Sequence, residues 1–211
     1  EFDKKGNKWI GTMKQGLASF NDTIWKTYFT PNYTQTMNSY FIFIDFDDEG
    51  YPWIGIDGIG IKHFDGESWL LFDSTATSQN KNVTSIAKDK QGNKWITTRN
   101  GLLKYNGENW SSYLFEYRDF NSITIDSLGN KYIGTYNGTI KIEADTLISY
   151  PKNRWLVDNL VYSINIDSQG KILIGSSNHI TIFDKGNWSR FDQYPLIEGE
   201  TFYDLSYLVE D

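Results

Sequence analysis

Hydrophobic and polar residues alternate along short stretches of this chain, and turn-forming residues separate each stretch from the next. Residues 82–89 are the clearest case, because apolar and polar side chains alternate through Asn-Val-Thr-Ser-Ile-Ala-Lys-Asp. Three more short stretches follow at residues 94–98, 101–105 and 109–113. A period of two residues is typical of a β-strand with one buried face. The pattern therefore predicts four consecutive antiparallel strands, of which residues 82–89 form the innermost.

This unit recurs five times along the chain. Each copy has an Asp-x-x-Gly turn, then an aromatic or apolar residue, then Ile-Gly-Thr or a close variant. The turn glycines are spaced 44, 42, 37 and 41 residues apart, and they are Gly6, Gly50, Gly92, Gly129 and Gly170. Such intervals are typical of the four-stranded blades of a β-propeller. The repeat therefore predicts an all-β fold, a β-propeller of five four-stranded blades.

A second aromatic signal recurs in phase with the first. It is an aromatic-x-x-aromatic step found at Trp25–Tyr28, Trp69–Phe72, Trp110–Tyr113 and Trp188–Phe191, with a weaker copy at Leu147–Tyr150. We expect this step to form the outer strand of each blade. Strands this short cannot bury a face alone, so neighbouring blades must stack to supply the core. The tryptophans of both signals are therefore expected to be core residues.

The repeats divide the chain into a single domain, residues 1–211, with blades at about 1–37, 38–79, 80–118, 119–158 and 159–198. The first blade lacks its inner strand, and the end of the segment 199–211 resembles one. We expect this segment to act as a closing strand that completes the first blade and closes the ring, because closure removes exposed sheet edges. An arc cut from a longer propeller is the alternative.

Composition excludes several classes of function. The 211 residues carry a formal net charge of −7, and the basic residues are scattered, which argues against a nucleic-acid partner. The chain has no cysteine, so a disulfide framework and a thiolate metal site are both excluded. No apolar run approaches the roughly 18 residues that a membrane span needs, and the first residues show no signal-peptide pattern.

The third repeat also carries a family resemblance. Residues 89–105 read Asp-Lys-Gln-Gly-Asn-Lys-Trp-Ile-Thr-Thr-Arg-Asn-Gly-Leu-Leu-Lys-Tyr. This stretch resembles the two-component regulator propeller repeat almost throughout, and the resemblance extends over essentially the whole chain. Similar proteins include the periplasmic sensor regions of hybrid histidine kinases in polysaccharide-degrading bacteria, and secreted and lipoprotein relatives of unassigned function. The resemblance implies a bacterial sensor-like domain in the periplasm or outside the cell, with an oligosaccharide as its ligand.

The acidic motif has two interpretations. Clustered carboxylates, as at residues 45–49, are ligands that Ca²⁺ prefers, but the spacing is not that of an EF-hand loop. A turn in which Asp caps backbone N–H groups and Gly takes a positive φ explains all five copies at once. We therefore predict structural turns, with no metal site and no cofactor. The only histidines, His63 and His179, lie in different repeats, and His63 is expected on a solvated strand face.

One tryptophan, Trp155, has no place in the repeat. It follows Arg154 in a connection between blades, and such connections share one face of a propeller with the turns between second and third strands. We call this the loop face. Trp155 could stack on a sugar ring there, or it could fill the seam between two blades. The predicted ligand-binding residues of the loop face are Trp155, Arg154, Arg99, Asn100, Tyr136, Asp57, Lys14, Tyr117 and Arg118.

These features predict a non-enzymatic propeller that binds an oligosaccharide or a protein partner at the loop face. No catalytic residue is singled out, because two histidines in different repeats do not suggest a triad or a metal site. Two alternatives stay open. One is a polysaccharide lyase or glycosidase on the same scaffold, and the other is a structural platform for protein interactions. The sequence leaves the oligomeric state open.

Overall fold

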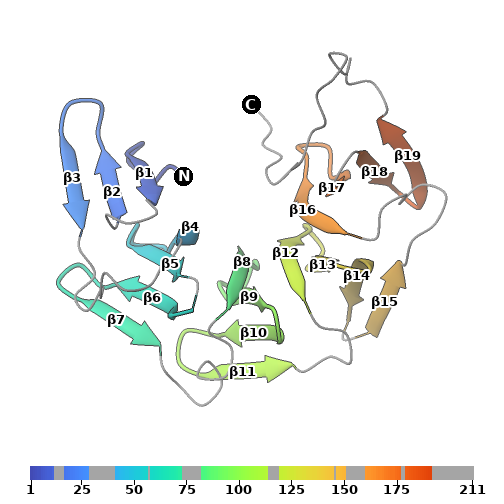
Figure 1. Ribbon diagram of the computed structural model, residues 1–211, viewed down its shortest axis with the longest axis horizontal. Coiled ribbons are helices and arrows are strands. Elements are labelled where there is room, and N and C mark those ends of the chain that lie inside the picture. Colours follow the sequence, from blue (N-terminus) through green and yellow to red (C-terminus); the bar gives the residue numbers. More distant parts are fainter. Residues whose placement is uncertain are drawn as a thin grey trace. The chain divides into compact units, whose positions relative to one another are not determined.

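The computed structural model describes residues 1–11, 17–28, 41–56, 58–72, 82–113, 119–144, 146–150, 160–176 and 179–191. These residues contain nineteen strands and no helix, arranged as five antiparallel sheets (Figure 1). The first sheet has three strands, β1 (Lys8–Gly11), β2 (Leu17–Phe20) and β3 (Trp25–Tyr28). The all-β prediction is confirmed.

The other four sheets have four strands each, and each sheet follows the order of the chain. The second contains β4 (Phe41–Phe46), β5 (Pro52–Ile56), β6 (Gly60–Phe64) and β7 (Trp69–Phe72). The third contains β8 (Val83–Lys88), β9 (Lys94–Thr98), β10 (Gly101–Tyr105) and β11 (Trp110–Tyr113). The fourth contains β12 (Phe120–Ile125), β13 (Lys131–Thr135), β14 (Gly138–Glu143) and β15 (Thr146–Tyr150). The fifth contains β16 (Val161–Ile166), β17 (Ile172–Ser176), β18 (Ile180–Asp184) and β19 (Asn187–Phe191).

The first sheet has the beginning of a fourth strand. Glu1 and Trp9 exchange two backbone hydrogen bonds, of 2.8 and 3.2 Å, and Phe2 forms a bridge with Lys8. The expected closing strand, residues 199–211, lies outside the described residues. The closure of the ring and its five blades therefore stay predictions.

The chain forms two compact units, residues 1–85 and 86–211, and the division falls within β8. In the first unit, β1 contacts β4 of the next sheet. In the second unit, β12 contacts β9 of the preceding sheet and β16 of the following one. Within each unit, the first strand of a sheet thus packs against a strand of the preceding sheet.

The hydrophobic clusters lie between sheets, as the short strands require. In the first unit, one cluster joins Trp9 and Leu17 of the first sheet to Ile54 and Ile56 of the second. In the second unit, one cluster joins the third and fourth sheets and includes Trp95, Leu102, Phe120, Ile123, Ile133 and Ile140. Another joins the fourth and fifth sheets and includes Tyr132, Val161, Ile164, Ile172 and Ile174.

The tryptophans of the two signals differ in burial. Trp9, Trp53 and Trp95 are buried, so the prediction that they are core residues is confirmed. Trp25, on the outer strand β3, is 57% exposed and stacks on Phe20 with ring centroids 4.7 Å apart. The prediction of a core residue is wrong for Trp25, because an outer strand has a neighbour on one side only and lies at the edge of the sheet interface.

The motif isoleucine shows how burial depends on the neighbouring sheet. Ile54, Ile96, Ile133 and Ile174 are at most 1% exposed, whereas Ile10 is 45% exposed. Three of the buried isoleucines, Ile54, Ile133 and Ile174, lie in clusters shared with the preceding sheet. Ile10 belongs to none of the three clusters described above.

The glycine of the Ile-Gly-Thr motif allows close packing between sheets. A Cβ atom built on Gly134 would lie 2.6 Å from Ser122 Oγ and 2.6 Å from Val161 Cγ1. Val161 belongs to β16 of the next sheet, and it is fully buried. Gly134 therefore serves the contact between sheets, because any larger side chain there would overlap with Val161 of the neighbouring sheet. At Gly55 the nearest atoms belong to Phe43 of the same sheet, so this glycine makes room within its own sheet.

Candidate functional site

The Asp-x-x-Gly turns are closed by the aspartate side chain. Asp89 Oδ1 accepts hydrogen bonds from the backbone N–H groups of Gln91 (3.0 Å) and Asn93 (2.9 Å). Asp89 Oδ2 accepts from Asn93 Nδ2 (2.8 Å) and from the indole Nε1 of Trp95 (2.8 Å). Gly92 has a φ of 82°, which favours glycine. The prediction of structural turns is confirmed, since the carboxylate is occupied by donors of its own repeat.

The hydrogen bonds also set the charge state of the turn. Partial burial would raise the pKa of Asp89, but the bonds from Trp95, Asn93 and Gln91 outweigh it, and the pKa is lowered. The pKa of Asp3 is lowered in the same way, because bonds from Trp9, Asn7 and Lys5 outweigh its desolvation. Both carboxyl groups are therefore ionised at neutral pH and act as fixed acceptors.

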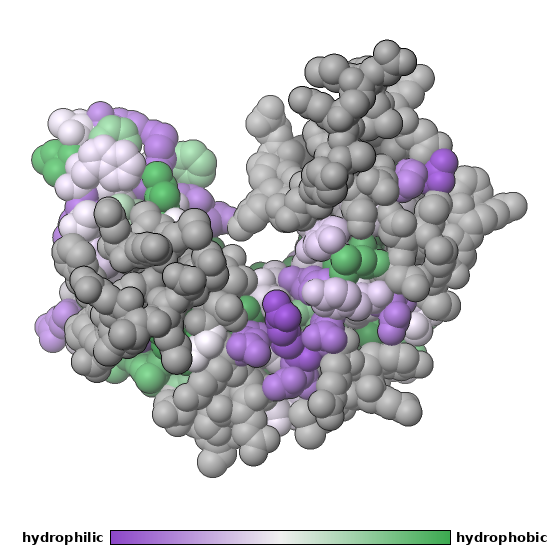
Figure 2. Space-filling model, in the orientation of Figure 1, coloured by the Kyte–Doolittle hydropathy of each residue, from purple (hydrophilic) through white to green (hydrophobic). Residues whose placement is uncertain are grey.

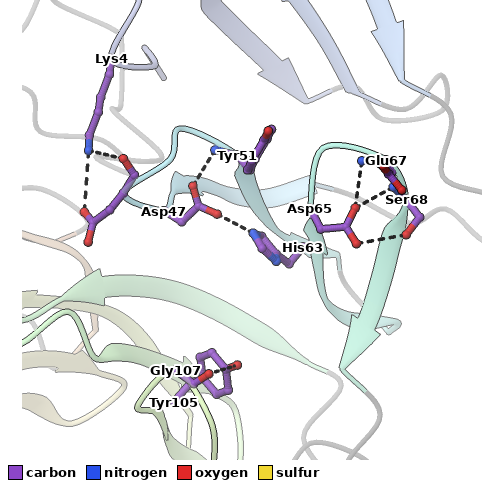
Figure 3. A network of polar contacts seen from close by, with 10 residues as sticks. Lys4, Asp47, Tyr51, His63, Asp65, Glu67, Ser68, Tyr105 and Gly107 are labelled. Atoms are coloured by element: carbon purple, nitrogen blue, oxygen red, sulfur yellow. Dashed lines mark hydrogen bonds and ion pairs between the residues drawn. The ribbon is translucent and has the colours of Figure 1, made fainter.

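The second repeat uses a different donor. Here Asp47 Oδ1 accepts from the backbone N–H of Tyr51 (2.7 Å), while Asp47 Oδ2 lies 2.7 Å from His63 Nε2 (Figure 3). The imidazole of His63 stacks on Trp53, with ring centroids 4.6 Å apart, and Trp53 stacks on Phe72. The His63 side chain is only 16% exposed, so the expected solvated position is wrong. The histidine holds the place at the aspartate that the indole holds in the first and third repeats.

The opposite ends of the strands carry the turns of the predicted loop face. Thr98 Oγ1 donates to Gly101 O (3.0 Å) and accepts from the backbone N–H of Asn100 (3.1 Å). This single hydroxyl closes the turn between β9 and β10. Arg99 and Asn100 occupy the turn, and both are exposed. The last residue of the motif therefore fixes the backbone that presents two predicted ligand-binding residues.

The fourth sheet repeats this arrangement. Thr135 Oγ1 donates to Gly138 O (2.9 Å) and accepts from the backbone N–H of Asn137 (2.9 Å). Tyr136, which lies in this turn between β13 and β14, is 44% exposed, although aromatic rings are usually more buried. A rigid turn thus presents an aromatic ring to solvent.

A backbone contact places a connection between repeats next to the first of these turns. The N–H of Asp119 donates to the carbonyl of Arg99 at 2.8 Å, and Asp119 has a φ of 67°. Asp119 directly precedes β12, so the end of the connection from the third to the fourth sheet lies beside the β9–β10 turn. The expectation that connections and turns share one face is confirmed at this position.

The two turns belong to the same end of the second unit. Phe120 at the start of β12 pairs with Thr135 at the end of β13, and β12 also contacts β9. The turns that carry Arg99 and Tyr136 therefore lie on adjacent sheets at the same strand ends. Figure 2 shows hydrophilic side chains gathered over the position that β9 has in Figure 1. The structure thus brings Arg99, Asn100 and Tyr136 to one end of neighbouring sheets.

Sequence reasoning missed two further residues near this end, because a β-bulge leaves no fixed sequence signal. The register shifts between Phe120 and Ser122 in β12 and between Val161 and Ser163 in β16, so Asn121 and Tyr162 are the extra residues. Asn121 Nδ2 donates to the carbonyl of Val161 at 2.9 Å, which links the two bulges. Bulges re-aim side chains and are enriched next to functional sites.

The remaining predicted residues lie outside the described part of the chain. They are Lys14, Asp57, Tyr117, Arg118, Arg154 and Trp155. Both interpretations of Trp155 therefore stay predictions.

Two further features are absent from the described residues. No group of three or more His, Cys, Asp or Glu side chains within these ranges is arranged to hold a metal ion. The same ranges contain no helix with the length and hydrophobicity needed to cross a membrane.

The fold is shared with extracellular domains of bacterial sensor systems. The extracellular domain of a putative hybrid two-component system from B. thetaiotaomicron has a TM-score of 0.74 and 21% identity, over 91% of this chain and 28% of that domain. The extracellular domain of a putative one-component system from the same bacterium has a TM-score of 0.73 and 19% identity, over 90% of this chain and 30% of that domain. The resemblance to sensor propellers is confirmed at the level of the fold.

The same fold also occurs in an enzyme. Catalytically inactive virginiamycin B lyase from Staphylococcus aureus has a TM-score of 0.74 and 14% identity, over 92% of this chain and 68% of the lyase. No protein-family model and no curated protein sequence matches the chain. At such identities the likeness concerns the fold, and this chain spans less than a third of either sensor-system domain.

Proposed function

We propose that this chain is a non-enzymatic binding domain of an exported, sensor-type protein, and that it takes its ligand or partner at the loop face. The observation that supports this most is the pair of braced turns on adjacent sheets. Thr98 and Thr135 fix the two turns through their hydroxyl groups, and the turns hold Arg99, Asn100 and Tyr136 in solvent. Rigid presentation lowers the entropy lost on binding.

The chemistry of these side chains favours a carbohydrate. An exposed tyrosine offers an apolar ring face for stacking on a sugar, and the guanidinium and amide beside it offer donors for hydroxyl groups. Asn121 and Tyr162 would extend the same surface toward the inner strands. The extracellular location of the sensor-system domains that share the fold supports an exported location for this chain.

The test combines a glycan array with a turnover assay on the same polysaccharides. We expect binding without cleavage, and a loss of affinity of at least tenfold in Arg99→Ala and Tyr136→Ala, about 1.4 kcal/mol. Leu128→Ala is a matched control, because Leu128 is 85% exposed in the Asp126 turn at the opposite strand ends. Equal affinity in all three variants would exclude the loop face as the binding site.

The same experiment separates the alternatives. New reducing or unsaturated ends would identify a polysaccharide lyase or glycosidase. The virginiamycin B lyase supports this alternative only by sharing the fold, and a shared fold does not imply a shared activity. Absence of both binding and turnover, together with capture of a protein ligand at the loop face, would identify an interaction platform.

We further propose that residues 1–211 form one five-bladed propeller, in which residues 199–211 supply the missing strand of the first blade. The residues Glu1–Asp3 support this proposal, because they form the start of that strand beside β1. Glu1 pairs with Trp9, whereas β1 continues for two more residues, to Gly11, which Glu1–Asp3 do not cover. A strand added there would cover the open edge of β1.

A further inference from the structure

Two buried hydroxyl groups of the fourth sheet have no hydrogen-bond partner. They are Ser122 Oγ in β12 and Thr139 Oγ1 in β14, and the two residues are 7% and 2% exposed. Neither oxygen has a partner among the residues that the structure describes. A hydroxyl group that is buried without a partner destabilises the folded state, and native proteins contain few such groups. Both hydroxyls therefore need an additional donor or acceptor.

The two hydroxyls lie in one row across the sheet, on either side of Gly134. Ser122 pairs with Gly134, and Gly134 pairs with Thr139, so the side chains of this row lie on the same face of the sheet. That face meets the fifth sheet, because a Cβ atom at Gly134 would lie 2.6 Å from Val161 Cγ1 of β16. Both hydroxyls thus belong to the interface between the fourth and fifth sheets.

The spacing of the row suits one small bridging molecule. Ser122 Oγ lies 2.6 Å from the Cβ position of Gly134, so this hydroxyl extends over the glycine. Opposite residues of an antiparallel pair have Cβ atoms about 4.5–5.5 Å apart, which places Thr139 Cβ at about this distance on the other side. Two O–H···O hydrogen bonds of about 2.8 Å each span such a gap. One water molecule supplies both bonds.

Thr139 is a polar residue at a position that is otherwise aliphatic. In the other four sheets, the residue that pairs with the equivalent of Gly134 is Leu17, Ile61, Leu102 or Ile180. In the third sheet the equivalent row contains Thr97 and Leu102, which are both larger than Gly134 and Thr139. A buried water molecule needs polar partners and space. The fourth sheet combines hydroxyl groups with smaller side chains at this place.

We propose that Ser122 Oγ and Thr139 Oγ1 bind one internal water molecule between the fourth and fifth sheets. Water suits this pair, because a hydroxyl group can both donate and accept, and neither side chain has a charge that would attract an ion. Gly134 directly precedes Thr135, which braces the turn that carries Tyr136. The water therefore joins the strands directly beneath this turn. The site does not depend on the proposed function.

A crystal structure of the chain at a resolution that shows ordered water tests the proposal directly. We expect a water molecule within about 3.2 Å of both Ser122 Oγ and Thr139 Oγ1. A protein donor or acceptor bonded to either hydroxyl in place of water would overturn the proposal. So would the absence of any ordered water beside the two hydroxyls.

A double-mutant cycle in urea gives a second test. Thr139→Val keeps the shape of the side chain and removes its hydroxyl, and Ser122→Ala does the same on the other side. Each variant should lower the urea midpoint, and the second substitution should cost less once the first has removed one partner of the shared water.

Ser163→Ala is the matched control for this cycle. Ser163 pairs with Gly175 as Ser122 pairs with Gly134, but it lies on the opposite side of the fifth sheet from Ile174, which packs against the fourth sheet. Its effect should add to that of Thr139→Val. Additive effects of Ser122→Ala and Thr139→Val would exclude a shared water. A higher urea midpoint in both single variants would show that the hydroxyls are unpaired, and it would also overturn the proposal.

Discussion

The indole Nε1 of Trp95 donates a 2.8 Å hydrogen bond to Oδ2 of Asp89, six residues earlier in the chain. The same pair of atoms joins Trp9 to Asp3 at 2.9 Å. Trp95 is at the same time a member of the cluster between the third and fourth sheets. One bond therefore couples a surface turn to the packing between sheets.

This coupling predicts that Asp89→Ala destabilises the protein by about 2–4 kcal/mol, because four donors lose their acceptor and one of them is a buried indole. Trp95→Phe keeps most of the ring and should cost less. Asp65→Ala is the control, since the donors to Asp65 among the described residues come from Glu67 and Ser68 in an exposed hairpin. Urea unfolding measures all three variants, and equal losses for Asp89 and Asp65 would contradict the role of the indole bond.

Acid should weaken the fold through these same turns. The pKa values of Asp3 and Asp89 are lowered in the folded protein. Their stabilising effect is thus fully present above the unfolded-state value of about 3.9 and is lost as the pH falls through the lower folded-state pKa. We expect the urea midpoint to be level near neutral pH and to drop below about pH 4. Asp89→Asn should flatten that drop, and an unchanged acid profile in this variant would refute the assignment.

His63 should contribute more to the free energy of unfolding than Lys104, the residue at the equivalent position of the third repeat. Replacing His63 by Leu leaves Asp47 Oδ2 without the imidazole and removes the ring that stacks on Trp53. We expect a loss of about 1–3 kcal/mol, since a half-buried acceptor loses its partner. Lys104→Ala is the matched control, because Lys104 pairs with Trp95 as His63 pairs with Trp53. Thermal unfolding should show a clearly smaller loss for the control.

The motif glycine predicts a coupled pair of substitutions. Gly134→Ala should cost about 1–3 kcal/mol, because the new methyl group would overlap with Val161 and Ser122. In a Val161→Ala background the same substitution should cost less, since the neighbouring strand then leaves room. A double-mutant cycle measured by urea unfolding checks this, and additive effects would show that the contact between sheets does not restrict Gly134.

Closure of the ring can be tested at Ile10. If residues 199–211 complete the first blade, their deletion should lower the melting temperature, and Ile10→Ala should cost about as much as Ile96→Ala, about 2–5 kcal/mol. If the first sheet stays open, Ile10→Ala should cost far less, because its side chain is 45% exposed whereas Ile96 is fully buried. Unfolding of both variants and of the deletion decides between a closed ring and an open arc.

The strands of the third repeat were predictable almost to the residue. The expected strands at 94–98 and 101–105 are β9 and β10, and the expected strand at 82–89 is β8 at Val83–Lys88. Their signals are local, because the turn aspartate binds donors within six residues and the turn glycine needs only its own φ. Because these signals are local, the sequence also predicted that Arg99 and Asn100 lie in a turn.

The sequence by itself determined the repeat, its turns and its strands, because hydrogen bonds within one repeat and the two-residue alternation act over a few residues. Only the tertiary structure decided which of five equivalent isoleucines is exposed, where Asn121 and Tyr162 bulge, and which side chain meets Asp47. These outcomes depend on the neighbouring sheet or on a strand farther along the chain. Identical motifs therefore acquire different burial and different partners, because each repeat packs against a different neighbour.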